Sequence, residues 1–88
     1  MKIKDGFILQ TIAGSTVVVP VGEATTILNG IITLNESGII LWNLLAKGAD
    51  IDQLADGLIK EYGIPDSKAS KDADSFIETL RKIGCLEE

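Results

Sequence analysis

The chain has 88 residues, of which 45% are hydrophobic and 24% are charged. These values are typical of one globular domain, so residues 1–88 are expected to fold as a single unit. A chain of this length buries only about two-thirds of its unfolded surface, which leaves little room for a deep catalytic cavity. Its 13 acidic and 8 basic side chains give a net charge of −5. This charge repels polyphosphates and argues against a nucleic-acid partner.

Residue types that usually hold metals or begin covalent catalysis are scarce. The chain contains one cysteine, Cys85, and no histidine. It therefore has neither an internal disulfide nor the usual ligand set for zinc, and Cys85 is interpreted as an inert core thiol because no histidine activates it. Neither a G-x-G-x-x-G loop nor a Walker motif is present. We expect no catalytic activity, no cofactor and no metal site.

The sequence indicates a soluble, cytoplasmic protein without a membrane partner. The first ten residues lack an apolar run of signal-peptide length, and no segment reaches the roughly 18 apolar residues of a membrane span. The single cysteine also fits a reducing compartment.

The first part of the chain is rich in β-branched residues, which favours strands. We predict strands over residues 7–13 and 15–21, joined by a tight turn at Gly14. Pro20 has no N–H to donate, so the second strand is expected to end there or to lie unpaired.

Two interpretations are possible for the segment that follows. Asn29 and Gly30 form a typical hairpin turn between apolar pairs. Alternatively, Glu23 and Ala24 open a short helical turn that leads into a single strand over residues 31–34. We favour the second interpretation.

After Leu34 the apolar pattern changes to a helical one. Asn35 is placed as an N-cap, and the acidic Glu36 suits the positive end of the helix dipole. The helix is predicted to continue to about Ala46 and to stop at Lys47-Gly48, and its central Trp42 is interpreted as a core residue.

Two further amphipathic helices are predicted. The second begins after Asp50, which forms a capping box with Gln53, and ends at residues 63–65. The third begins between residues 66 and 70 and continues to Gly84. The apolar face of the second comprises Ile51, Leu54, Ala55, Leu58, Ile59 and Tyr62. The inner face of the third comprises Ala69, Ala73, Phe76, Ile77, Leu80 and Ile83.

This order of elements predicts an α+β, winged-helix-like fold, with three short antiparallel strands followed by three helices. The last two helices resemble a helix-turn-helix, which makes a nucleic-acid-binding or regulatory module the alternative function. The charges of the third helix cancel, however, so it lacks the positive surface that drives binding to DNA. These charges are Lys68, Lys71, Arg81 and Lys82 against Asp66, Asp72, Asp74 and Glu78.

The strand predicted over residues 31–34 contains no charge or proline that would protect a free edge. If it lies at the side of the sheet, an extended peptide could add there as a further strand, with alternate side chains between the sheet and the third helix. Two other possibilities are that another part of the chain covers this edge and that the domain binds partners through its exposed faces.

Several segments together resemble the PqqD-like proteins, named after pyrroloquinoline quinone biosynthesis protein D. These segments are VVVPVG, NGIITLN, LNESG, LWNLL, IDQLADGLIKEYGI and KDADSFIETLRKIGCLEE, and the resemblance covers about residues 7–88. It implies a winged-helix-like domain that binds the leader segment of a ribosomally made precursor peptide. In such a domain the leader adds as a strand beside the third strand and lies against the third helix. A partner enzyme, often a radical S-adenosylmethionine (SAM) protein, can then modify the rest of the peptide.

The resemblance also implies a set of peptide-binding residues. The strand edge would be formed by Gly30, Ile31, Ile32, Thr33 and Leu34. The groove wall on the third helix would be formed by Asp72, Ser75, Phe76 and Thr79, with Lys68 on the same flank, where it could meet an acidic leader. The expected role is that of a non-catalytic peptide chaperone.

Overall fold

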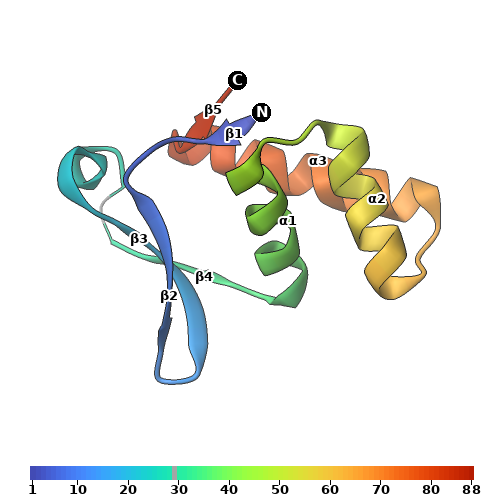
Figure 1. The fold of residues 1–88 in the computed structure, drawn as a ribbon, viewed down its shortest axis with the longest axis horizontal. Helices are drawn as coiled ribbons and strands as arrows, with labels where there is room; N and C mark the ends of the chain where they lie inside the picture. The colour runs from blue at the N-terminus through green and yellow to red at the C-terminus, as the bar shows by residue number, and fades with distance from the viewer. Residues whose placement is uncertain (29) are drawn as a thin grey trace.

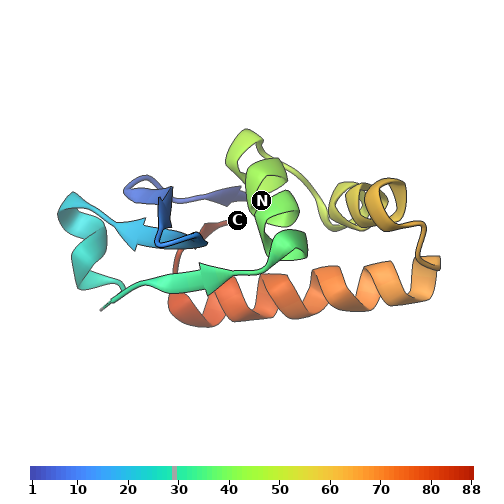
Figure 2. The same cartoon turned by 90° about the horizontal axis from the view of Figure 1, so that it is seen from below.

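The computed structural model describes residues 1–28 and 30–88. It measures 38 × 31 × 19 Å along its principal axes. A three-stranded sheet forms one end of the molecule and the helices form the other (Figure 1). The longest helix passes along the molecule beneath both parts (Figure 2).

The sheet consists of strands β2 (Phe7–Ile12), β3 (Ser15–Pro20) and β4 (Ile32–Leu34), antiparallel in the order β2-β3-β4. Ala13 and Gly14 join β2 to β3 with positive φ angles of 51° and 81°, as a type I′ hairpin turn requires. The predicted hairpin is confirmed, and each strand ends one residue earlier than predicted.

The connection from β3 to β4 contains a short 3₁₀ helix, η1 (Gly22–Thr26). The predicted helical turn after residue 22 is therefore confirmed, whereas the competing hairpin turn involves Asn29, which lies outside the described residues. The strand that follows begins at Ile32. Ile31, which we had expected within it, precedes it, and so does Gly30, which the resemblance assigned to the strand edge.

Helix α1 (Glu36–Lys47) begins at the predicted cap. The backbone N–H of Gly38 donates to Oδ1 of Asn35 at 2.8 Å, which satisfies one of the donors that the first turn leaves free. Gly48 ends the helix with φ of 92°.

The two remaining helices also match their predictions closely. Helix α2 (Ile51–Tyr62) begins with the complete capping box between Asp50 and Gln53. Helix α3 (Asp66–Ile83) begins directly after Pro65, without a side-chain cap. Short connections between the helices keep α1, α2 and α3 packed against one another.

Two further features differ from the sequence prediction. Strands β1 (Lys2–Ile3) and β5 (Leu86–Glu87) pair as a second, two-stranded sheet that brings the chain ends together. Such short strands have no period of their own, and only the folded context makes them pair. Tyr62 was placed on the buried face of α2 but is 43% exposed, because it is the last residue of that helix.

The core lies where the three helices meet the inner side of the sheet. Helix α1 is its central element, and its Trp42 is 3% exposed, as predicted. Fully buried side chains come from each of the larger parts of the fold: Val18, Leu45, Leu54, Leu58, Leu80 and Cys85. In the part of the chain that the structure describes, no helix is long and apolar enough to cross a membrane.

Replacing a core leucine should measure the importance of α1. Leu45 is fully buried, so Leu45→Ala should lower the free energy of unfolding by about 2–5 kcal/mol through lost burial and the cavity left behind. Urea denaturation would measure this change. The exposed Asn43 on the same helix is the control, since Asn43→Ala should change stability by less than about 0.5 kcal/mol.

Alkylation of Cys85 should report on unfolding. Burial raises the pKa of the Cys85 thiol, which reduces the thiolate that attacks iodoacetamide at a given pH. The folded protein should therefore react more slowly than the urea-unfolded protein by more than an order of magnitude, as mass spectrometry would show. Equal rates in the two states would contradict the buried position of this side chain.

Candidate functional site

The direction of the backbone groups in the sheet follows from one hydrogen bond at the base of the hairpin. The N–H of Val21 donates to the C=O of Gly6 at 2.7 Å. Because the N–H and C=O of successive strand residues point to opposite edges, odd-numbered residues of β3 direct these groups towards β2. Even-numbered residues of β3 direct them towards β4.

This alternation identifies the free backbone groups of β4. Thr16 lies opposite Leu34 and Val18 lies opposite Ile32, so Ile32 and Leu34 direct their N–H and C=O towards β3. Thr33 directs its N–H and C=O to the other side, where none of the described strands pairs with β4. The predicted free edge of the sheet is therefore confirmed, and its accessible groups belong to Thr33.

Two adjoining hollows lie beside this edge, between β4, the start of α1 and one flank of α3. The first has a volume of about 400 Å³ and the second of about 300 Å³. The first is lined by Ile32, Thr33, Leu34, Asn35, Gly38, Phe76 and Thr79. The second is lined by Asn35, Ser37, Gly38, Leu41, Asp72, Ser75, Phe76 and Thr79. Together they form one groove, which we call the β4–α3 groove.

The structure brings together seven of the ten predicted binding residues. Those that line the β4–α3 groove are Ile32, Thr33, Leu34, Asp72, Ser75, Phe76 and Thr79. Gly30 and Ile31 lie just before β4, and Ile31 is 56% exposed. Lys68 lines neither hollow. Its ammonium lies 3.4 Å from the carboxylate of Asp72, where it flanks the second hollow.

The sequence prediction missed the contribution of α1. Its first turns supply Ser37, Gly38 and Leu41 to the groove, together with the cap residue Asn35. A Cβ atom on Gly38 would lie 3.1 Å from Oδ1 of Asn35, so glycine fits this crowded corner. The sequence did signal a helix start here, but only the fold shows that this start faces α3.

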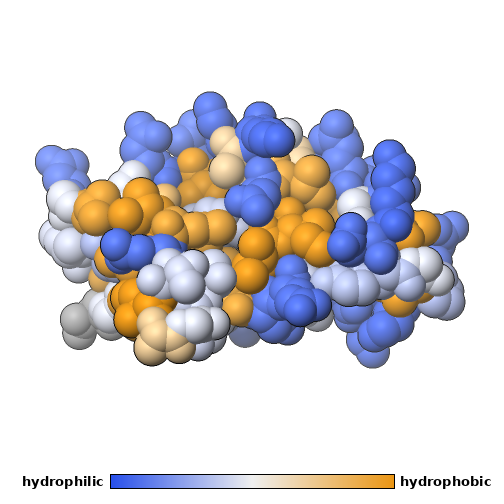
Figure 3. Space-filling model, turned by 60° about the horizontal axis from the view of Figure 1, so that its bottom comes forward, coloured by the Kyte–Doolittle hydropathy of each residue, from blue (hydrophilic) through white to orange (hydrophobic). Residues whose placement is uncertain are grey.

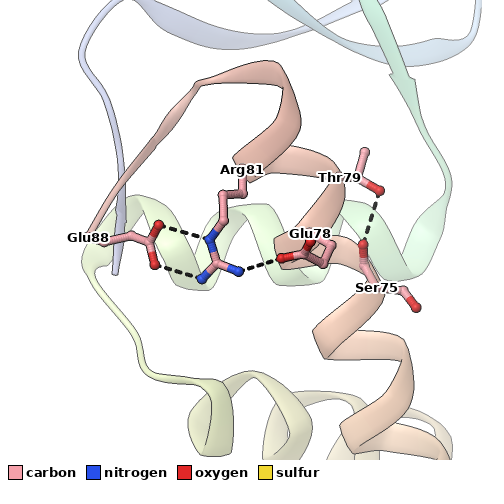
Figure 4. Close-up of polar contacts among 5 residues, drawn as sticks. All are labelled: Ser75, Glu78, Thr79, Arg81 and Glu88. Carbon is pink, nitrogen blue, oxygen red and sulfur yellow. Dashed lines mark hydrogen bonds and ion pairs between the residues drawn. The ribbon is translucent and has the colours of Figure 1, made fainter.

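The charged groups of α3 are arranged by flank. Arg81 makes ion pairs with Glu78 and Glu88 on the flank away from the groove. Figure 4 shows this cluster on one side of α3, while Thr79 and Ser75 lie on the side nearer β4. The Thr79 hydroxyl donates to the C=O of Ser75 at 3.0 Å within the helix.

The groove contains hydrogen-bonding and apolar groups but no recognisable catalytic set. Among the described residues, no group of three His, Cys, Asp or Glu side chains could hold a metal ion. The lone cysteine is buried elsewhere in the core. The arrangement therefore suits the binding of an extended chain, through free backbone groups on one wall and side-chain hollows next to them.

Two solved structures have a fold similar to that of this chain. The chain resembles a structure described as TbiB1 in complex with the TbiA(beta) leader peptide, with a TM-score of 0.78, 23% identity and coverage of 99% of this chain and 95% of that chain. It also resembles lasso peptide synthetase B1 complexed with the leader peptide, with a TM-score of 0.76, 15% identity and coverage of 99% and 96%. No curated protein matches the sequence.

The two structures are too distant in sequence to assign the chain to a family, but a family model does so. The model of coenzyme PQQ synthesis protein D matches residues 16–86, which include all of β3 but its first residue, β4 and all three α-helices. The α+β fold that the order of elements predicted is confirmed, and so is the resemblance to the PqqD-like proteins. The chain belongs to the PqqD family.

Proposed function

We propose that this protein binds the leader segment of a ribosomally made precursor peptide, which adds as a strand to the free edge of β4. The observation that carries the proposal is the position of this edge directly beside the β4–α3 groove. An added strand would lie about 4.8 Å from β4 and would hydrogen-bond to the outward N–H and C=O of Thr33. Main-chain bonding would supply affinity without requiring a particular leader sequence.

The two hollows would supply selectivity. Side chains on one face of a strand repeat about every 6.8 Å, so successive leader residues facing the groove could use the first and then the second hollow. The first is bounded by the partly buried apolar side chains of Ile32, Leu34 and Phe76. The second adds the polar groups of Ser37, Ser75 and Asp72. We expect an apolar leader residue in the first hollow and a hydrogen-bonding one in the second.

Two structural relatives support this assignment, because both are described in complex with a leader peptide. We infer that the protein is a non-catalytic, cytoplasmic chaperone that presents its bound precursor to a modifying enzyme, for which a radical SAM protein is our first candidate. Identification of a short precursor gene and a peptide-modifying enzyme beside its gene would test this wider role.

Removing the outward N–H of β4 should weaken leader binding. Thr33→Pro deletes this donor while leaving the groups of Ile32 and Leu34 that face β3, and proline is tolerated at such edge positions. Calorimetric titration with a synthetic leader from the adjacent precursor gene should show binding weakened by at least about tenfold, as expected for the loss of about 1.4 kcal/mol or more.

Thr11→Pro is the matched control for this experiment. Thr11 is exposed on β2, at the opposite edge of the sheet, so its replacement should leave leader affinity unchanged. Far-UV circular dichroism would verify that both variants fold. Binding of the leader to Thr33→Pro with wild-type affinity would refute addition at β4.

Filling the groove should block the leader without unfolding the protein. Thr79 is exposed and lines both hollows, so the large side chain of Thr79→Trp would occupy the space that leader side chains need. The expected result is at least a tenfold loss of affinity with little change in the urea midpoint. Ser67→Trp, at an exposed position in the first turn of α3 away from the groove, should bind the leader normally.

A further inference from the structure

The segment that forms the three-stranded sheet is almost free of charge. Between residues 6 and 35 the sequence contains one charged side chain, Glu23, although 24% of the whole chain is charged. Large exposed apolar side chains also gather in this region: Ile8, Ile12, Val21, Ile27 and Ile31. In Figure 3, apolar surface covers much of the sheet end, while hydrophilic side chains dominate the opposite end.

The sheet has a second free edge, on β2. The pairing that directs Gly6 towards β3 also directs the even-numbered residues of β2 towards β3. Leu9 and Thr11 therefore direct their N–H and C=O away from the sheet, where none of the described strands pairs with them. Natural proteins usually protect such an edge with a charge, a proline or a bulge. Strand β2, with the sequence FILQTI, has none of these.

We propose that β2 is a self-association edge, at which a second copy of this protein pairs antiparallel with the first. The segment ILQTI is symmetric about Gln10, with isoleucine two residues away on each side. A two-fold axis at Gln10 would pair the outward groups of Leu9 in each copy with those of Thr11 in the other. Such isologous contacts are the commonest form of dimer.

The same register buries the exposed side chains of β2. Ile8 and Ile12 are 44% and 47% exposed on the outer face of the sheet. Ile8 of each copy would lie opposite Ile12 of the other copy. These are non-hydrogen-bonded pairs, in which side chains approach most closely. Nearly all charges lie outside residues 6–35, so the net charge of −5 would oppose this contact only weakly.

The resulting six-stranded sheet would keep β4 at both outer edges. Each copy would therefore retain its β4–α3 groove, and dimerisation would not compete with a strand added there. The contact is limited to one strand of six residues from each copy, so it should be smaller than a standard interface. We expect a weak, concentration-dependent dimer.

Sedimentation equilibrium of the full chain, from micromolar to millimolar concentration, tests this proposal. Wild-type protein should shift from monomer to dimer, and Thr11→Pro should raise the dimer dissociation constant by at least an order of magnitude by removing an outward N–H. Thr33→Pro, the same substitution at the opposite edge, should dimerise normally. A wild-type protein that stays monomeric, or a dimer that Thr11→Pro leaves unchanged, would overturn the proposal.

A charge-pair experiment tests the register itself. Ile8→Glu alone should weaken the dimer, because no partner compensates the new charge. The double substitution Ile8→Glu with Ile12→Lys should restore it, since each acidic side chain would face a basic one of the other copy. Failure of the second substitution to restore association would exclude the Gln10-centred pairing. Leader binding at β4 is measured separately, so either proposal can fail without the other.

Discussion

The junction at Asn35 determines where the groove can form. Its side-chain oxygen accepts hydrogen bonds from the Gly38 N–H at 2.8 Å and from the Ser37 hydroxyl at 3.0 Å. These bonds begin α1 directly after β4 ends, so the free edge of the sheet and the first turn of a helix share one corner. Helix α3 passes this corner and encloses the two hollows.

Close packing between helices holds the far wall of the groove in place. The buried face of α3 includes Ala69 and Ala73, both 0% exposed, and such small side chains allow neighbouring helices to approach closely. On α2, a Cβ atom at Gly57 would lie 2.7 Å from Cδ1 of Leu44, so α1 and α2 also meet at short range. The packed helices hold Phe76 and Thr79 in place relative to β4, as the proposed binding of an extended strand would require.

Much of this architecture could be predicted from the sequence, because its signals are local. The Asn35 cap, the Asp50 capping box and the turn at Gly14 each depend on residues within a few positions. The β1–β5 pair and the contribution of Gly38 to the groove depend on contacts distant in sequence, which no periodicity reveals. The net charge of α3 does not reveal how its charges are arranged in space. Arg81 and its partners Glu78 and Glu88 occupy the flank of α3 away from the groove.

Recognition through backbone groups, as proposed for β4, would allow the site to tolerate sequence change. The N–H and C=O of Thr33 face outwards because of strand register, and most side chains at this position would leave them unchanged. The fold is retained in structures that share only 23% and 15% identity with this chain. Under the proposed function, a groove built on an edge strand would keep its main-chain contacts while the residues of its hollows diverge. Selectivity for a particular leader would then lie in a few side chains of α1 and α3.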